Sequence, residues 1–220
     1  MEIVPSGELQ KQFGRYSDEA MIRPVGVSRN GRVRFVMVPV DEYERLRRRE
    51  RVAGRVEDLD DETLEAIRGV EPGHGAQDAE KGSTLPQPGE VLNYSYLWEY
   101  EYVKGRDEGI KDRPVAVVLV TRQKDGIDQV HVVPLTTKAP TRDQLAIEVP
   151  DAVRRDLGLS GDKSWIIITE WNRFAWPGYD IRPIPGREPA VSYGYLPASF
   201  FRRVRDAIVA AGIGRPVDRD

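Results

Sequence analysis

The pattern of apolar and polar residues predicts two structured regions separated by a polar stretch. In the first region, the largely apolar residues 25–29 and 32–38 flank Asn30-Gly31. This pair tolerates the positive φ angles that a two-residue hairpin turn requires. The sequence therefore predicts a β-hairpin close to the N-terminus.

Helices are predicted on both sides of this hairpin. Ser6 favours a helix start, and Leu9 and Phe13 then lie four residues apart on one face. After the hairpin, Asp41 is followed three residues later by Glu44, which is a capping-box pattern. The first region is therefore predicted to be a small unit of mixed α and β structure.

The second region is predicted to be mainly β, so the chain as a whole belongs to the α+β class. Residues 151–157 favour a short helix, and Pro197 favours the start of a final helix that ends at Gly212. Five short apolar stretches typical of strands suit a small closed barrel. They are residues 91–97, 114–120, 129–134, 145–149 and 164–170.

Between the two regions, residues 56–71 predict an acidic helix, followed by a linker over 72–89 that is rich in Gly and Pro. Leu64 and Ile67 lie on one face of this helix and Leu59 lies near its start. So short a helix is marginal alone and needs a partner to stay folded. One interpretation is a solvated surface helix; the other is a peptide that docks its apolar residues in a groove.

Composition narrows the possible functions. The chain has 220 residues and no cysteine, which excludes disulfides, thiolate metal sites and cysteine nucleophiles. His74 and His131 are far apart and no cluster has metal-ligand spacing, so no metal or other cofactor is expected. No apolar run approaches the ~20 residues of a membrane helix, and no secretory signal begins the chain. A cytoplasmic location and no membrane partner are therefore predicted.

Charge is unevenly distributed along the chain. Residues 1–55 contain 12 Lys and Arg against 8 Asp and Glu, whereas residues 56–85 contain 2 against 9. A basic segment followed by an acidic one indicates two partners of opposite charge.

Candidate chemistry lies at the ends of two predicted strands. Arg113 precedes one apolar strand, and Thr136 and Thr137 end the next. An arginine and hydroxyl groups on one surface suit a phosphate. The alternative is an ordinary surface arginine with two threonines at a strand end.

The second region resembles the MazF/PemK family of toxin endoribonucleases over about residues 86–209. The resemblance rests on Pro88-Gly89-Glu90-Val91, on Arg113-Pro114 before an apolar strand, on Val133-Pro134-Leu135-Thr136-Thr137 and on 164–170. It implies an SH3-like barrel and metal-independent RNA cleavage that yields a 2′,3′-cyclic phosphate. In this family the catalytic roles correspond here to Arg113 and Thr136.

The segment before Arg113 departs from the family pattern because it is long and aromatic. Alternation places five aromatic residues on one strand face, either as core or dimer interface or as a platform on which RNA bases stack. The aromatic residues are Tyr94, Tyr96, Trp98, Tyr100 and Tyr102. The RNA-binding residues predicted beside the catalytic pair are Lys104, Arg106, Lys111 and Thr137.

The first region resembles the Phd/YefM antitoxin family over about residues 5–70, through Ser28-Arg29-Asn30-Gly31 and the segment 40–46. The resemblance implies a dimer that binds operator DNA and neutralises a toxin with the segment that follows. Arg29 matches the arginine of the family's hairpin, and Lys11 and Arg15 are candidates for the other DNA contacts.

The combined hypothesis is a type II toxin–antitoxin module in one chain. It comprises a DNA-binding unit (1–55), a toxin-neutralising helix (56–71, with Leu59, Leu64 and Ile67), a linker (72–89) and a toxin domain (90–220). Its expected partners are single-stranded RNA, operator DNA and further copies of the chain, as a homodimer or higher homo-oligomer. The alternative is a DNA-binding regulator whose barrel is catalytically silent and serves dimerisation or poisons a topoisomerase.

Overall fold

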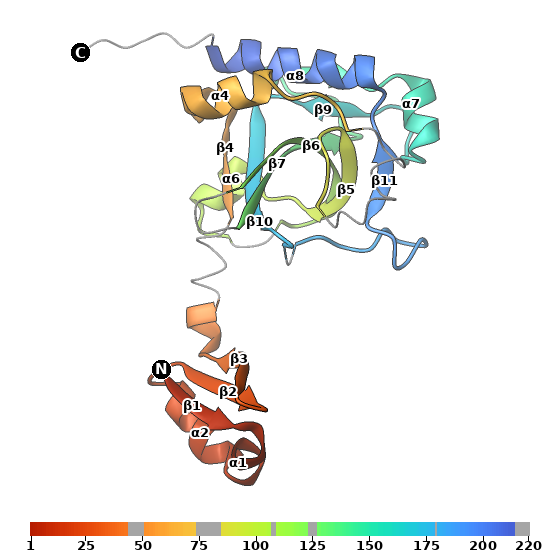
Figure 1. Cartoon of the computed structure of the whole chain (residues 1–220). Helices are drawn as coiled ribbons and strands as arrows, with labels where there is room; N and C mark the ends of the chain where they lie inside the picture. The colour runs from red at the N-terminus through yellow and green to blue at the C-terminus, as the bar shows by residue number, and fades with distance from the viewer. Residues whose placement is uncertain (44–50, 74–84, 107–108, 123–126, 179, 214–220) are drawn as a thin grey trace, which may run out of the picture. The chain divides into compact units, whose positions relative to one another are not determined.

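The computed structural model in Figure 1 divides the chain into two compact units, Met1–Arg49 and Glu50–Asp220. Both units contain helices and sheet, so the chain is of mixed α+β type. Glu44 of the predicted capping box, His74 and most of the predicted linker lie outside the described residues. The described residues are 1–43, 51–73, 85–106, 109–122, 127–178 and 180–213.

The described part of the first unit contains a three-stranded sheet and the helices α1 (Ser6–Lys11) and α2 (Phe13–Ala20), and residues 40–43 are also helical. β1 (Glu2–Pro5) pairs in parallel with β2 (Val25–Arg29), and β2 pairs antiparallel with β3 (Arg32–Met37). The chain passes from β1 to β2 through α1 and α2. A parallel pair needs such a crossover connection, so the two helices are part of what brings β1 beside β2.

The predicted hairpin is confirmed, but the predicted first helix is corrected. Asn30 and Gly31 have φ angles of 52° and 74°. At Gln12 the backbone leaves helical geometry, with φ −128°, and divides the helix in two. Leu9 is consequently buried while Phe13 is 60% exposed, because the two residues no longer share one helical face.

The second unit is built on an eight-stranded sheet with the order β11-β5-β6-β7-β10-β4, and β9 and β8 continue from β7. The described path ends at β11 and β4 without closing, whereas the sequence predicted a closed barrel. The strands are β4 (Val52–Arg55), β5 (Glu90–Ser95), β6 (Asp112–Arg122), β7 (Asp128–Thr136), β8 (Ala146–Glu148), β9 (Trp165–Ile167), β10 (Glu170–Trp176) and β11 (Ser192–Tyr195).

The described helices of the second unit are η1 (Val56–Asp58), α4 (Asp61–Arg68), α6 (Glu99–Val103), α7 (Asp151–Asp156) and α8 (Ala198–Ile213). α8 buries Phe200, Phe201, Val204 and Ile208, as its sequence predicted. α4 packs against α8, and Figure 1 shows the two side by side on one side of the sheet.

The aromatic segment after β5 is not a continuous strand. β5 ends at Ser95 and α6 begins at Glu99, so the prediction of five aromatic residues on one strand face is wrong. Tyr94 and Tyr96 are buried, in a core cluster that contains Phe174, whereas Tyr100 is exposed. The first two aromatic residues are therefore core, as one of the two interpretations held.

Candidate functional site

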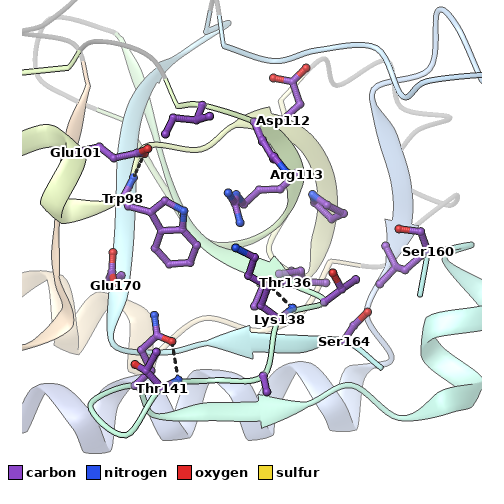
Figure 2. Close-up of a pocket in the computed structure, with 18 of the residues that line it drawn as sticks. Trp98, Glu101, Asp112, Arg113, Thr136, Lys138, Thr141, Ser160, Ser164 and Glu170 are labelled. Atoms are coloured by element: carbon purple, nitrogen blue, oxygen red, sulfur yellow. Dashed lines mark hydrogen bonds between the residues drawn. The ribbon is translucent and has the colours of Figure 1, made fainter. Parts of the chain in front are cut away.

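A cavity of about 690 Å³ opens on the second unit, and we call it the pocket. Its lining comes from Trp98 and α6, from the start of β6, from the end of β7 with the residues after it, from the first residue of β10, and from Leu159, Ser160 and Ser164. In Figure 2 the side chains of Trp98, Arg113 and Lys138 lie in the same space. The pocket thus brings together Arg113 and Thr136, which are 23 positions apart in the sequence.

Arg113, the second residue of β6, is half-buried and stacks on aromatic rings. Its Cζ lies 4.8 Å from the centroid of the Trp98 ring and 6.0 Å from that of Tyr96. Burial lowers the pKa of the guanidinium, yet an arginine side chain stays charged at neutral pH. Its Nε atom is buried and has no hydrogen-bond partner among the described residues. Arg113 therefore presents a fixed positive charge to the pocket.

Hydroxyl groups and further cations line the pocket near the end of β7. Thr136 Oγ1 accepts a hydrogen bond from the backbone N–H of Lys138 at 3.1 Å, so the hydroxyl proton remains available to donate. Thr137, Lys138 and Lys111 are exposed lining residues. Sequence reasoning missed Lys138, although a cation two positions after a threonine at a strand end was the available signal. Cations together with hydroxyl donors make this part of the pocket suitable for an anion.

Two buried carboxylates, Glu101 and Glu170, also line the pocket, and both accept hydrogen bonds from the backbone around Trp98. Glu101 Oε2 accepts from the Trp98 N–H and Glu170 Oε2 accepts from the Glu99 N–H, each at 3.1 Å. Burial raises the pKa of Glu170 above the ordinary value for a carboxyl group. Neither residue was predicted, because single glutamates at the ends of elements carry no motif.

Lys104 and Arg106 do not line the pocket, although both were predicted to bind RNA with Arg113. Lys104 follows α6, and its Nζ lies 5.8 Å from the ring centroid of Tyr100, which does line the pocket. Arg106 is exposed beyond the end of that helix. The helix turns this segment away from the extended path that the prediction assumed.

Residues 51–73, which we call the docked segment, form part of the second unit. The sequence interpretation placed 51–55 with the N-terminal unit. In the structure β4 pairs with β10, from Glu170 opposite Arg55 to Arg173 opposite Val52. The segment thus adds an edge strand to the sheet, which is a known mode of peptide binding.

The three residues predicted to neutralise a toxin are buried in the main core cluster. Leu59, Leu64 and Ile67 are 4%, 4% and 1% exposed and belong to the same cluster as Val204 and Ile208 of α8. A cluster of this kind indicates that the docked segment is an integral part of the core and is more than a solvated surface helix.

The acidic side chains of the docked segment do not meet the cations of the pocket. Glu71 forms ion pairs with Arg202 and Arg205 of α8, at 3.0 and 3.3 Å. None of the described residues of the docked segment lines the pocket. Among the described residues, the helix of the docked segment follows the apolar face of α8 and places Glu71 beside α8 instead of at the pocket.

Arg51, the first described residue of the docked segment, inserts its charged side chain into the second unit. It is 5% exposed, and its Nε donates to the Tyr94 hydroxyl at 2.9 Å. Its Nη2 donates to the Ser95 carbonyl and forms an ion pair with Asp180 at 3.1 Å. A buried cation is tolerated only with partners of this kind. Sequence reasoning missed Arg51 because it follows a run of arginines without a distinguishing pattern.

The residues predicted to bind DNA are exposed on the first unit. Arg29 ends β2 next to the hairpin turn, opposite Arg32 in the register of the two strands. Lys11 ends α1 and Arg15 lies on α2, with its Cζ 5.2 Å from the Tyr16 ring centroid. Because Pro5 is paired with Ser28, α1 begins at the end of the sheet that carries Arg29.

No group of three or more potential metal ligands was found among the described residues, and none of their helices is long and apolar enough to cross a membrane.

Comparison with known proteins identifies one part of the chain. Residues 1–73 match the model of the antitoxin Phd_YefM family of type II toxin–antitoxin systems. The match covers the described part of the first unit and also the docked segment. No curated protein and no solved structure matches the chain. The family resemblance predicted for the N-terminal region is confirmed, and the resemblance of the rest to MazF/PemK toxins stays a prediction.

Proposed function

Because residues 1–73 carry a Phd/YefM antitoxin domain, we propose that the chain is a toxin–antitoxin module in one polypeptide. In this proposal, the remainder of the second unit is a metal-independent endoribonuclease, and the docked segment holds it inactive. The observation that carries the proposal is the pocket in which Arg113 and Thr136 meet, on the body to which the antitoxin segment is docked.

The proposed reaction is a transesterification within the RNA chain. The 2′-oxygen attacks the adjacent phosphorus and forms the P–O2′ bond, the P–O5′ bond breaks, and the proton lost from the 2′-hydroxyl is balanced by one gained at the 5′-oxygen. Arg113 stabilises the negative charge that develops on the phosphorane, as fixed cations in a partly water-excluded site do. Thr136 positions a phosphate oxygen or the attacking hydroxyl. The products are a 2′,3′-cyclic phosphate and a 5′-hydroxyl.

The arrangement of the chain explains why the intact protein is expected to be nearly inactive. Tethering keeps an inhibitory segment at an effective concentration on the order of millimolar beside its binding surface. Cutting the tether converts docking into a reaction between two molecules, which dilution then reverses. Activity should therefore appear only after both steps.

The test uses the full chain with a protease site placed at Gly82. Labelled single-stranded RNA in EDTA is incubated with intact chain, with cut chain at high concentration, and with cut chain diluted to nanomolar concentration. We expect cleavage in the diluted sample alone, and none from a diluted Arg113→Ala chain. If the diluted chain leaves RNA intact across pH and salt, the nuclease proposal fails. The regulator or topoisomerase-poison alternative then gains support.

The first unit supports a second proposed function, operator binding by a dimer. The family match and the exposed Lys11, Arg15 and Arg29 favour contacts with DNA phosphates. β3 forms one edge of the described sheet and exposes Val33 and Phe35, by 42% and 53%, which favours pairing with a second copy.

Fluorescence anisotropy with duplex DNA from upstream of the protein's own gene tests this function. Arg29→Ala should weaken binding and reduce the slope of log K against log salt by about one. An affinity and slope equal to those of the unchanged chain would exclude Arg29 from the interface.

A further inference from the structure

The described residues of the docked segment do not line the pocket, but the segment supports the residues around Trp98, which does line it. We call Leu97, Trp98 and Glu99 the wall; these residues lead from the end of β5 into the first turn of α6. Three consecutive backbone N–H groups of this wall donate to buried side chains: Leu97 to Asn172 Oδ1, Trp98 to Glu101 Oε2 and Glu99 to Glu170 Oε2, each at 3.1 Å. The wall is therefore held mainly by side chains of β10.

β4 of the docked segment pairs with these same positions of β10. Arg55 lies opposite Glu170 and Ala53 lies opposite Asn172 in the register. Asn172 is fully buried and also donates to the Leu97 carbonyl at 2.8 Å, so it fixes both polar groups of that residue. α6, which follows Trp98, also contacts β4. Removing β4 would turn β10 into an edge strand and take away one side of its support.

Arg51 provides a second connection between the docked segment and the wall. It binds the Tyr94 hydroxyl and the Ser95 carbonyl at the end of β5. From Tyr94, aromatic contacts continue to Tyr96 at 6.4 Å and from Tyr96 to Trp98 at 5.1 Å between ring centroids. Trp98 in turn stacks on Arg113. Packed side chains with discrete arrangements are a physical route for coupling between two sites.

We propose that the docked segment inhibits the nuclease by fixing this wall, which holds Trp98 over Arg113, and that Arg51 is the positioning residue of the lock. The proposal rests on the proposed function. Trp98 covers one face of the guanidinium and lies within the cavity that a nucleotide must enter (Figure 2). Cation–π attraction adds to the cost of moving the indole away. Release of the segment frees the wall and lets Arg113 meet a phosphate.

This lock differs from steric occlusion in a way that can be measured. An inhibitor that filled the pocket would act through residues on its lining, and the described residues of the docked segment contribute none. A lock acts through Arg51, which bonds to Tyr94 and Ser95 and does not line the pocket. Weakening Arg51 should therefore activate the intact chain without cutting the linker.

The test compares full-length Arg51→Met with full-length Arg68→Ala. Arg68 is an exposed residue of α4 that pairs with Glu65 of the same helix, so it serves as the matched control. In EDTA, Arg51→Met should raise RNA cleavage by the intact chain by about 5- to 150-fold, the usual range for coupling between sites. Arg68→Ala should remain at the level of the unchanged chain. Misfolding of Arg51→Met cannot imitate this result, because it would not create activity.

Hydrogen exchange gives a second readout that does not depend on nuclease activity. In Arg51→Met, the amides of Leu97, Trp98 and Glu99 should exchange at least about tenfold faster. The Phe201 amide of α8, which bonds to the carbonyl of Pro197 just before that helix, should keep its rate. Unchanged exchange at all three wall amides overturns the lock, whatever the activity.

The activity assays separate the two proposals. If the cut and diluted chain cleaves RNA but intact Arg51→Met does not, the lock fails and the nuclease proposal stands. If the cut and diluted chain does not cleave RNA, both the lock and the nuclease proposal fail.

Discussion

His131 shows how burial decides the role of a titratable residue. It is 4% exposed, its ring stacks on Trp171 at 5.5 Å between centroids, and it is not part of the pocket lining. Burial, with a smaller effect of the nearby Arg173, lowers its pKa from 6.5 to about 4. The residue is therefore neutral at pH 7 and belongs to the packing between β7 and β10.

This lowered pKa predicts a pH dependence of stability. Between pH 6.5 and about 4, the unfolded chain binds a proton at His131 that the folded chain does not. The free energy of unfolding is therefore higher above this window and decreases as pH falls through it. Urea unfolding of His131→Phe at several pH values should show a smaller loss over the same range. An NMR titration in which the ring protonates near pH 6.5 would contradict the prediction.

Gly212 of α8 packs closely against the Leu64 side chain of α4. A Cβ atom at position 212 would lie 2.5 Å from Leu64 Cδ2 and 2.8 Å from Cδ1, so the leucine must move. Gly212→Ala should destabilise the chain by about 1–3 kcal/mol, because overpacking outweighs the gain in helix propensity.

A double-mutant cycle tests this contact. Leu64→Ala should cost about 2–5 kcal/mol alone, but Gly212→Ala should cost little in its presence, because the clash has been removed. Additive losses in free energy of unfolding would mean that the two residues act independently.

At the scale of elements, the acidic helix predicted over 56–71 divides into η1 (Val56–Asp58) and α4 (Asp61–Arg68). Asp60 is the N-cap of α4, and its Oδ1 accepts from the Thr63 N–H at 2.7 Å, which lowers the pKa of the carboxyl group. The stabilisation is present above the ordinary carboxyl pKa and is lost as pH falls through the lowered one. Asp60→Ala should cost about 1 kcal/mol at pH 7 in urea unfolding. It should cost clearly less near pH 2, and an equal loss at both pH values would contradict the capping role.

Local patterns predicted those elements whose local preference agrees with the tertiary fold. The strands at 91–97, 114–120, 129–134 and 145–149 correspond to β5, β6, β7 and β8 within a few residues. The predicted strand 164–170 instead divides into β9, which ends at Ile167, and the start of β10 at Glu170. A continuous apolar run gave no sign of this break.

Elements that depend on a partner could not be predicted in the same way. β4 has the sequence Val-Ala-Gly-Arg, with no alternation, and it exists as a strand through pairing with β10. α6 lies where aromatic alternation indicated a strand, since Glu101 and Glu170 bind the backbone at its start. For the same reason the pocket was predicted only in part: Arg113, Thr136, Thr137 and Lys111 mark strand ends, whereas Glu101 and Glu170 act through tertiary contacts.

At the scale of the molecule, the boundary of the family match and the boundary of the fold differ. The antitoxin match ends at residue 73, but the first compact unit ends at Arg49. The docked segment therefore belongs to the antitoxin by sequence and to the second unit by packing. Its buried Val56, Leu59, Leu64 and Ile67 are part of the main core cluster of that unit.

This shared core predicts that a chain starting at residue 85 is less stable than one starting at residue 50. The shorter chain loses the four buried side chains named above from the main core cluster and the partner strand of β10, and it exposes the apolar face of α8. Its free energy of unfolding should be lower by at least about 2 kcal/mol, because a single large apolar truncation already costs that much.

A synthetic peptide of residues 51–73 should restore the lost free energy of unfolding in proportion to the logarithm of the peptide concentration. The same peptide with Leu64→Asp is the control, since a buried unpaired carboxylate opposes docking. Equal urea midpoints for the two chains, or equal rescue by both peptides, would show that the docked segment adds nothing to the core in solution.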